Sequence, residues 1–238
     1  MDVINAKSKL VDGQRMHPTM YGDDGWYAYE PGPYNKNALE LYFLTLRPED
    51  RERVGDNAWL SYLEGANPDY PENALREDFE RIRQRGEVMR NDATTPDTRL
   101  ADDPMDKNPA SVSSLIPLML GGLHPGHRGS ILHCTLRYFD PVARRAGIPD
   151  DVAALVEKLA PEETVVTLVN TNQLEERTVC IQAGGYAEHQ FTAATVDNRT
   201  AELDASHVTV TLAPGAGARL TLAMRRYDNQ PTMRFPWD

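Results

Sequence analysis

The stretch that decides the fold is His207-Val208-Thr209-Val210-Thr211-Leu212-Ala213-Pro214-Gly215-Ala216-Gly217-Ala218-Arg219-Leu220. Val208, Val210 and Leu212 alternate with polar residues, and this period of two predicts a strand with one buried face. The Pro-Gly-Ala-Gly segment that follows is typical of a turn. A further strand is predicted directly after it, so the stretch favours two successive strands joined by a tight connection.

The same pattern extends over much of the second half of the chain. Strands are predicted over 130–138, 164–170, 177–183, 190–196, 199–204, 207–213 and 218–227. Short segments rich in Gly, Asn and Asp separate most of them, which is typical of turns. Several short strands at close spacing indicate an antiparallel β-sandwich. We place this domain at residues 129–238.

One part of the predicted sandwich domain has helical spacing instead. Val152, Leu155, Val156 and Leu159 recur at intervals of three and four residues, as on one face of a helix. We therefore expect a short helical excursion at 140–147 and 150–159, between the first strand and the others.

Helical periodicity predominates in residues 1–128. The stripe from Leu39 to Leu46 predicts a first helix, and a second is expected from Pro48 to Gly65. A third follows Pro71, and a fourth, short helix is opened by Asn108-Pro109. The third helix carries an apolar stripe, which we expect to pack against the second helix as an antiparallel hairpin; its members are Leu75, Phe79, Ile82 and Met89. The fold class predicted is α+β.

The composition excludes some classes of protein and permits many. The chain has 238 residues, 40% hydrophobic and 26% charged, with a formal net charge of −11. A general nucleic-acid binder needs a basic surface to replace phosphate counterions, so this class is not expected. The longest apolar run, 115–123, is too short to span a bilayer. The N-terminus carries no apolar segment typical of a signal peptide, and the compartment stays open.

The first candidate site is an aromatic and acidic segment near the N-terminus, which is rich in Gly and Pro and is expected to be an ordered loop. Aromatic rings beside carboxylates suit a saccharide, which presents apolar ring faces and many hydroxyls. The candidate catalytic carboxylates are Asp23 and Asp24, although neighbours in sequence normally point apart. The candidate substrate-binding residues are His17, Trp26, Tyr27, Tyr29, Glu30 and Tyr34. The alternative is an aromatic plug that closes the helical layer.

Two further groups of residues are candidate sites. Three histidines and one cysteine lie within eleven residues, namely His124, His127, His133 and Cys134. Their spacing does not match a zinc motif, so we expect no metal. Glu188 beside His189 could form an acid–base couple, but in a turn between strands the pair is expected to order the loop. No phosphate-cradling or nucleophile-elbow motif occurs, and no cofactor is expected.

The order of elements resembles the C-terminal part of α/α-toroid, six-hairpin glycosidase-like, carbohydrate-active proteins. The likeness rests on the aromatic segment 25–34, the helical hairpin 48–89, and the strands from 165–170 through 212–220. It implies a helical layer that carries an active site and a β-sandwich behind it. The toroid of this family has about a dozen helices, so the helical layer predicted here is an incomplete one.

The resemblance implies a carbohydrate-associated protein, the C-terminal portion of a glycoside hydrolase- or polysaccharide lyase-like assembly. A saccharide is then the expected ligand. A thin helical layer leaves apolar surface exposed, so a homo-oligomer or a partner chain that completes the layer is also expected. Two alternatives stay open. One is a non-enzymatic assembly module, and the other is a small-molecule lyase or dehydratase of the toroid type. Whether Cys134 and Cys180 pair is left open by the sequence.

Overall fold

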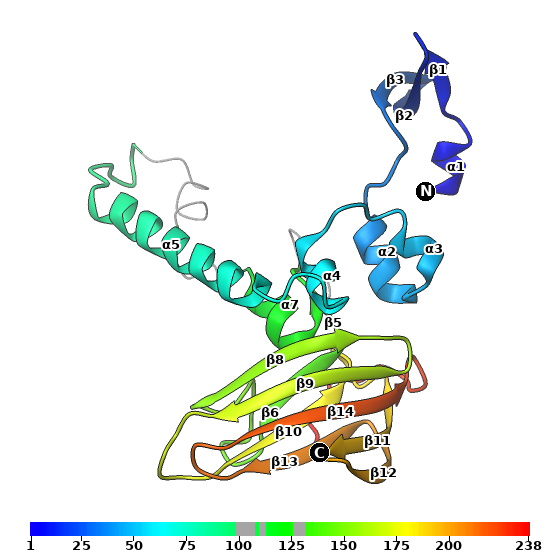
Figure 1. Ribbon diagram of the computed structural model, residues 1–238. Coiled ribbons are helices and arrows are strands. Elements are labelled where there is room, and N and C mark those ends of the chain that lie inside the picture. Colours follow the sequence, from blue (N-terminus) through cyan, green and yellow to red (C-terminus); the bar gives the residue numbers. More distant parts are fainter. Residues whose placement is uncertain (99–107, 110–112, 126–131) are drawn as a thin grey trace. The chain divides into compact units, whose positions relative to one another are not determined.

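The computed structural model describes residues 1–98, 108–109, 113–125 and 132–238. These residues divide into two compact units, 1–56 and 57–238. The chain combines helices with antiparallel sheets, which confirms the α+β class. Figure 1 shows the elements of both units.

The first unit holds a small sheet and short helices. In chain order its elements are α1 (Asp2–Asn5), β1 (Lys9–Val11), β2 (Gln14–Gly22), β3 (Gly25–Pro31), α2 (Ala38–Thr45) and α3 (Pro48–Arg51). The three strands form one antiparallel sheet in the order β1-β2-β3. The prediction of a loop at 21–34 was therefore wrong. Gly22 and Gly25 flank a two-residue turn, and Gly25 adopts a φ of 96°, so the glycines close a hairpin here.

The second unit begins with helices. They are α4 (Ala58–Leu63), α5 (Tyr70–Arg90) and α7 (Leu115–Leu120). The predicted second helix is in fact two, α3 and α4. Asn57 begins the latter, because its side-chain oxygen accepts a hydrogen bond from the backbone N–H of Leu60 at 3.0 Å.

Two antiparallel sheets make up most of the second unit (Figure 1). The order in the first is β13-β10-β6-β7 and in the second β12-β11-β14-β9-β8. The strands are β6 (Leu136–Asp140), β7 (Arg145–Ala146), β8 (Val152–Leu159), β9 (Glu163–Asn170), β10 (Arg177–Ala183), β11 (Gln190–Val196), β12 (Arg199–Ala205), β13 (His207–Leu212) and β14 (Gly217–Arg225). A separate two-stranded ladder joins β4 (Gly122–Leu123) to β5 (His133–Cys134).

The two large sheets enclose one apolar core, as expected of a sandwich. Tyr138 and Ile181 enter it from the first sheet, and Val166, Phe191 and Leu222 enter it from the second. All five side chains are 2% exposed or less. Apolar burial of this kind is the dominant stabilising contribution to a fold.

The predicted helical excursion was wrong, because its residues form β7 and β8. A register shift interrupts β8 between Val156 and Lys158, where it pairs with β9. This bulge changes which residues face inward, so Val152, Val156 and Leu159 all reach the core. A bulged strand thus reproduces the spacing of a helical stripe. The hydrogen-bonded pairing of β8 with β9 along its length makes this segment a strand and not a helix.

Candidate functional site

The β2–β3 hairpin of the first unit carries most of the predicted site residues. Partners directly opposite each other on two strands share a face, and neighbours along a strand alternate between faces. The register pairs His17 with Glu30, Pro18 with Tyr29 and Tyr21 with Trp26. The register shifts once between Pro18 and Met20 and again between Met20 and Tyr21, and each shift changes which residues of the two strands share a face.

The shifts place three aromatic residues on one face of the hairpin. Ala28 lies on the face opposite to that of its neighbour Tyr29, and its cross-strand partner Met20 lies there too. Tyr21, the neighbour of Met20, therefore lies on the face of Tyr29, and so does its partner Trp26. The contacts agree. The rings of Tyr21 and Trp26 meet edge to face at 5.1 Å, and the Tyr29 hydroxyl donates to the Trp26 carbonyl at 3.5 Å. We call Tyr21, Trp26 and Tyr29 the aromatic face.

The surroundings of the aromatic face are polar and open. The Lys9 ammonium lies 3.7 Å from the centre of the Tyr29 ring, a cation–π contact. Tyr21 is 70% exposed, while Trp26 and Tyr29 are partly exposed. Stacked or edge-packed aromatic rings with one side in solvent offer a flat apolar surface with polar edges.

The other face of the hairpin has a different character. The Tyr27 hydroxyl lies 3.4 Å from the Met20 sulfur and its ring packs against Gly22, so Tyr27 is turned away from the aromatic face. His17 and Glu30 also lie on this second face, 3.9 Å apart. The aromatic residues predicted as one platform therefore divide between two faces.

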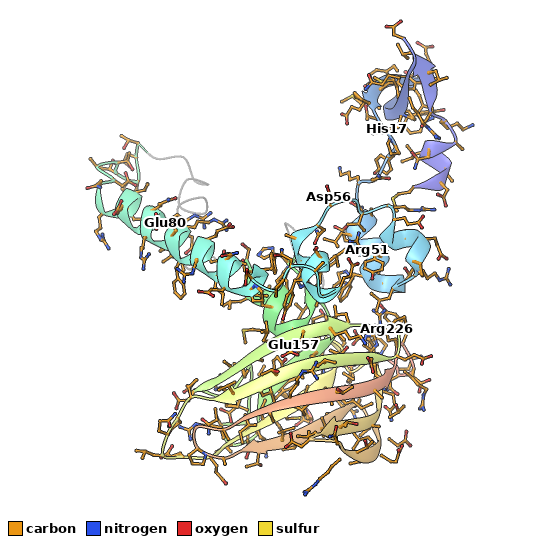
Figure 2. All side chains as sticks on the ribbon, in the orientation of Figure 1. His17, Arg51, Asp56, Glu80, Glu157 and Arg226 are labelled. Carbon is orange, nitrogen blue, oxygen red and sulfur yellow. The ribbon has the colours of Figure 1, made fainter. Side chains whose placement is uncertain are left out.

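His17 is a buried residue of the hairpin, 8% exposed (Figure 2). Its Nδ1 lies 3.0 Å from the carbonyl oxygen of Gly32, and its ring meets the Tyr34 ring edge to face at 5.5 Å. Tyr34 is held in turn by Asn5, whose Oδ1 accepts from the Tyr34 backbone N–H at 2.7 Å. These contacts connect the end of β3 to α1 within the first unit.

Asp23 and Asp24 form the turn at the tip of the hairpin. Both Asp23 and Asp24 are exposed. A glycosidase needs two carboxyl groups on either side of the scissile bond, at a set separation. Neighbouring residues of one two-residue turn do not provide two sides of a cleft by themselves. Their catalytic role stays a prediction.

The histidine and cysteine segment does not form a metal centre in the part of the chain that the structure describes, where no group of three His, Cys, Asp or Glu residues could hold an ion. His127 lies outside the described residues. Cys134 is 2% exposed, and burial is the main reason that its thiol pKa rises to about 12. Such a thiol is a poor nucleophile and a poor metal ligand at neutral pH.

The two cysteines do not form a disulfide, and both are buried free thiols. Burial also raises the pKa of Cys180, to about 11. Both residues therefore behave as small apolar side chains, Cys180 in β10 and Cys134 in the β4–β5 ladder.

Glu188 and His189 order a loop, as their place between strands predicts. The Glu188 carboxylate accepts a hydrogen bond from the Tyr186 backbone N–H at 2.7 Å. His189 is 2% exposed, and burial, followed by the nearby Arg226 charge, lowers its pKa to about 4. An imidazole that is neutral and enclosed at physiological pH fits a structural role better than acid–base catalysis.

Among the described residues, no helix is both long enough and apolar enough to cross a membrane. A family model described as a domain of unknown function, DUF8034, matches residues 55–116, which include α4 and α5. Neither the curated proteins nor the solved structures contain a significant match to the chain.

Proposed function

We propose that the chain is a carbohydrate-associated protein that binds glycan through the aromatic face of its N-terminal sheet. The observation that carries this proposal is the alignment of Tyr21, Trp26 and Tyr29 on one side of the hairpin. Carbohydrate rings stack on such surfaces through their apolar faces, and their hydroxyls bond to polar groups at the edge. Lys9 is one such polar group, 3.7 Å from the Tyr29 ring.

The sandwich has a supporting role in this proposal. Its core is closed, its cysteines are buried, and its one buried histidine beside a carboxylate orders a loop. The whole arrangement would then be the C-terminal portion of a glycoside hydrolase- or polysaccharide lyase-like assembly. That part of the proposal rests on the order of elements and on an analogy of fold.

Affinity electrophoresis in gels that contain soluble polysaccharides, neutral in one set and uronate-rich in another, tests the binding. Trp26→Ala is expected to abolish retardation by the polysaccharide that retards the wild type. The matched control is Tyr27→Ala, which removes an aromatic ring that is 67% exposed on the other face of the same hairpin. Far-UV circular dichroism establishes that both variants keep the sheet.

Three outcomes contradict the proposal. The wild type is not retarded in any gel, or Trp26→Ala migrates like the wild type, or Tyr27→Ala loses retardation to the same extent. The last outcome indicates a general loss of hairpin structure or a site on the opposite face.

A second candidate function is that of a non-enzymatic assembly module. It is favoured by the number of large apolar side chains that the small first unit leaves in solvent. Val3, Leu10 and Met20 are exposed by 77%, 75% and 54%. Apolar exposure on this scale is typical of surfaces that bind another polypeptide. Light scattering tests it, since a mass above the 26.7 kDa of one chain supports assembly and a clean monomer opposes self-association.

A further inference from the structure

Two surfaces of the second unit have no neighbour in the described part of the chain: one side of α5 and the outer edge of β13. On α5, Phe79 is 59% exposed and Met89 is 52% exposed. The prediction that the apolar stripe of this helix packs against the preceding helix was therefore wrong. Arginines and glutamates alternate beside the stripe, so its charges favour no particular occupant. The edge of β13 has a more specific arrangement of groups.

β13 is the outermost strand of the four-stranded sheet (Figure 1). It pairs with β10 over its whole length without a register shift. Directly before β13, the Ala183 backbone N–H donates to the Ser206 carbonyl at 2.8 Å, so these two residues form a hydrogen-bonded pair. Such pairs alternate with non-hydrogen-bonded pairs along an antiparallel ladder. The backbone of Val208, Val210 and Leu212 therefore bonds to β10, and the backbone of His207, Thr209 and Thr211 does not.

The side chains of the ladder agree with this assignment. Side chains approach most closely in non-hydrogen-bonded pairs, and the Thr211 hydroxyl lies 3.1 Å from that of Thr178 opposite. The Thr209 side chain likewise forms a hydrogen bond to Cys180 opposite. The backbone N–H and C=O groups of His207, Thr209 and Thr211 consequently point away from the sheet, and they have no backbone partner among the described residues.

The other three edges of the two sheets are protected against pairing with a further strand. β12 carries Arg199, Glu202 and Asp204. β8 has Glu157 and Lys158 at its bulge, and β7 is only 2 residues long. Charges, bulges and shortness are the features that keep edge strands from pairing with other chains. β13 has none of them, because its 6 residues include no Lys, Arg, Asp, Glu or Pro.

The open groups of β13 match a second copy of the same strand. Thr209 is the middle one of the three open residues, so a two-fold axis at Thr209 brings His207 opposite Thr211 of the second copy. Each pair of open residues then exchanges two hydrogen bonds, which uses every open N–H and C=O of both strands. The same register places Val208 opposite Val210. Both valines are partly exposed in one copy and face the core side of the sheet, where cross-strand pairs of β-branched residues stabilise a ladder.

The charge of the chain favours the same surface. A net charge of −11 makes most contacts between two copies repulsive, whereas β13 meets its copy without a charged side chain. We infer that β13 is the contact between two copies of the chain, which pair edge to edge into one continuous antiparallel sheet with two-fold symmetry. A strand of 6 residues is about 20 Å long, so the interface falls below the roughly 1,200 Å² of stable complexes and the dimer is weak and reversible. This inference is independent of glycan binding.

Amide hydrogen exchange resolved by residue tests the contact, because it reports each backbone N–H separately. In dilute wild-type protein the N–H groups of His207, Thr209 and Thr211 are expected to exchange fast, and those of Val208 and Val210 slowly. In concentrated protein the first three are expected to slow by about tenfold while the other two stay unchanged. Sedimentation between about 1 and 200 μM should show the mass rising from 26.7 kDa toward twice that value.

Variants of Thr209 locate the contact. Thr209→Lys keeps the backbone N–H but places two ammonium groups side by side at the two-fold axis, and should raise the dissociation constant by about tenfold or more. Thr209→Pro removes an N–H that β10 does not use, and should leave the chain monomeric.

The matched control is Thr200→Lys. Thr200 is also an exposed threonine of an edge strand, and its hydroxyl lies 2.8 Å from that of Thr195 on the neighbouring strand. This variant is expected to dimerise as the wild type does. Far-UV circular dichroism and thermal unfolding establish that all three variants keep the sandwich.

Three results overturn the inference. The wild type sediments as a monomer at every concentration, or Thr209→Lys dimerises like the wild type, or the mass rises while the Thr209 N–H stays unprotected. The last two place the contact on another surface. A monomeric wild type that binds a fluorescent peptide of residues 206–213 identifies an extended segment of another polypeptide as the occupant. Loss of polysaccharide retardation has no bearing on these readouts, so the two proposals fail separately.

Discussion

The imidazole of His189 accepts a hydrogen bond from the backbone N–H of Tyr227, at 3.0 Å through Nδ1. The two rings also meet edge to face with their centres 4.7 Å apart. This pair fastens the segment after β14 to the loop between β10 and β11. Protonation of Nδ1 would break the hydrogen bond and place a charge in a buried position, so the contact couples the stability of the sandwich to pH.

Stability is expected to fall as the pH is lowered from about 6.5 to 4. The folded-state pKa of His189 is about 4, against 6.5 for an exposed histidine, so the unfolded chain binds more protons in this window. The contribution is fully present above pH 6.5 and corresponds to on the order of 3 kcal/mol. Urea unfolding of the wild type and of His189→Gln at pH 7.5 and 4.5 measures it. The variant should show the smaller loss between the two pH values. Equal losses would contradict this account.

Asn229 is expected to be essential for holding the C-terminal segment. Its side-chain amide donates to the carbonyls of His189 at 2.9 Å and Ala187 at 3.3 Å, and to the Gln190 side chain at 2.8 Å. Asn229→Ala removes all three bonds and should lower the free energy of unfolding by about 1–3 kcal/mol. Chemical denaturation checks this value. Gln173→Ala, at an exposed amide, should change stability by less than about 0.5 kcal/mol. A similar loss in both variants refutes the assignment.

The Tyr138 hydroxyl is expected to anchor α7 on the sandwich. It donates to the Met119 carbonyl at 2.6 Å from a side chain that is 2% exposed, and burial raises its pKa well above the usual range. Tyr138→Phe leaves that carbonyl without this donor and should destabilise the fold by about 1–3 kcal/mol. Hydrogen exchange should show faster opening of α7. Tyr227→Phe, at a half-exposed ring, serves as the control. Unchanged exchange in α7 would rule out the anchor.

The same substitution is expected to act in opposite directions at two glycines. A Cβ at Gly122 would lie 2.8 Å from the Cα of Cys134, and closer still to the His133 carbonyl oxygen, where β4 pairs with β5. Gly122→Ala should therefore destabilise the protein by about 1–3 kcal/mol. A Cβ added at Gly86, within α5, would meet only the Arg90 guanidinium, at a contact distance of 4.0 Å, so Gly86→Ala should increase stability by about 0.5–1 kcal/mol. Thermal unfolding of both variants measures the signs, and two changes of the same sign contradict the prediction.

The sequence predicted the sandwich well because alternation is a local signal. The predicted ranges 177–183 and 190–196 are those of β10 and β11, and β12, β13 and β14 differ from their predicted ranges by only a few residues. It failed where a bulge altered the alternation. In β8 the bulged strand turns Val152, Val156 and Leu159 inward as a helical stripe would, and only pairing with β9 distinguishes the two structures. The prediction missed the β2–β3 hairpin for a related reason. Gly22 and Gly25 are as typical of an irregular loop as they are of a tight turn, so the sequence does not distinguish the two.

The candidate site was predicted as a set of residue types but not as a surface. Trp26, Tyr27 and Tyr29 are close in sequence, and a loop could place them together. Register shifts on either side of Met20 decide that Trp26 and Tyr29 share a face with Tyr21 while Tyr27 does not. Tyr21 and Lys9 were not among the predicted binding residues. Their membership depends on cross-strand pairing, which no local pattern shows.

By itself the sequence determined the strands from β9 to β14, because each of these strands carries its own alternation and its own turns. It also determined that α5 is a long helix with one apolar stripe. Only the tertiary structure decided what those surfaces meet. The strand faces are buried because two sheets enclose them, whereas Phe79 stays in solvent because α5 packs through Ala74 and Asp78. Periodicity fixes which residues share a face, and long-range packing alone selects the face that is covered.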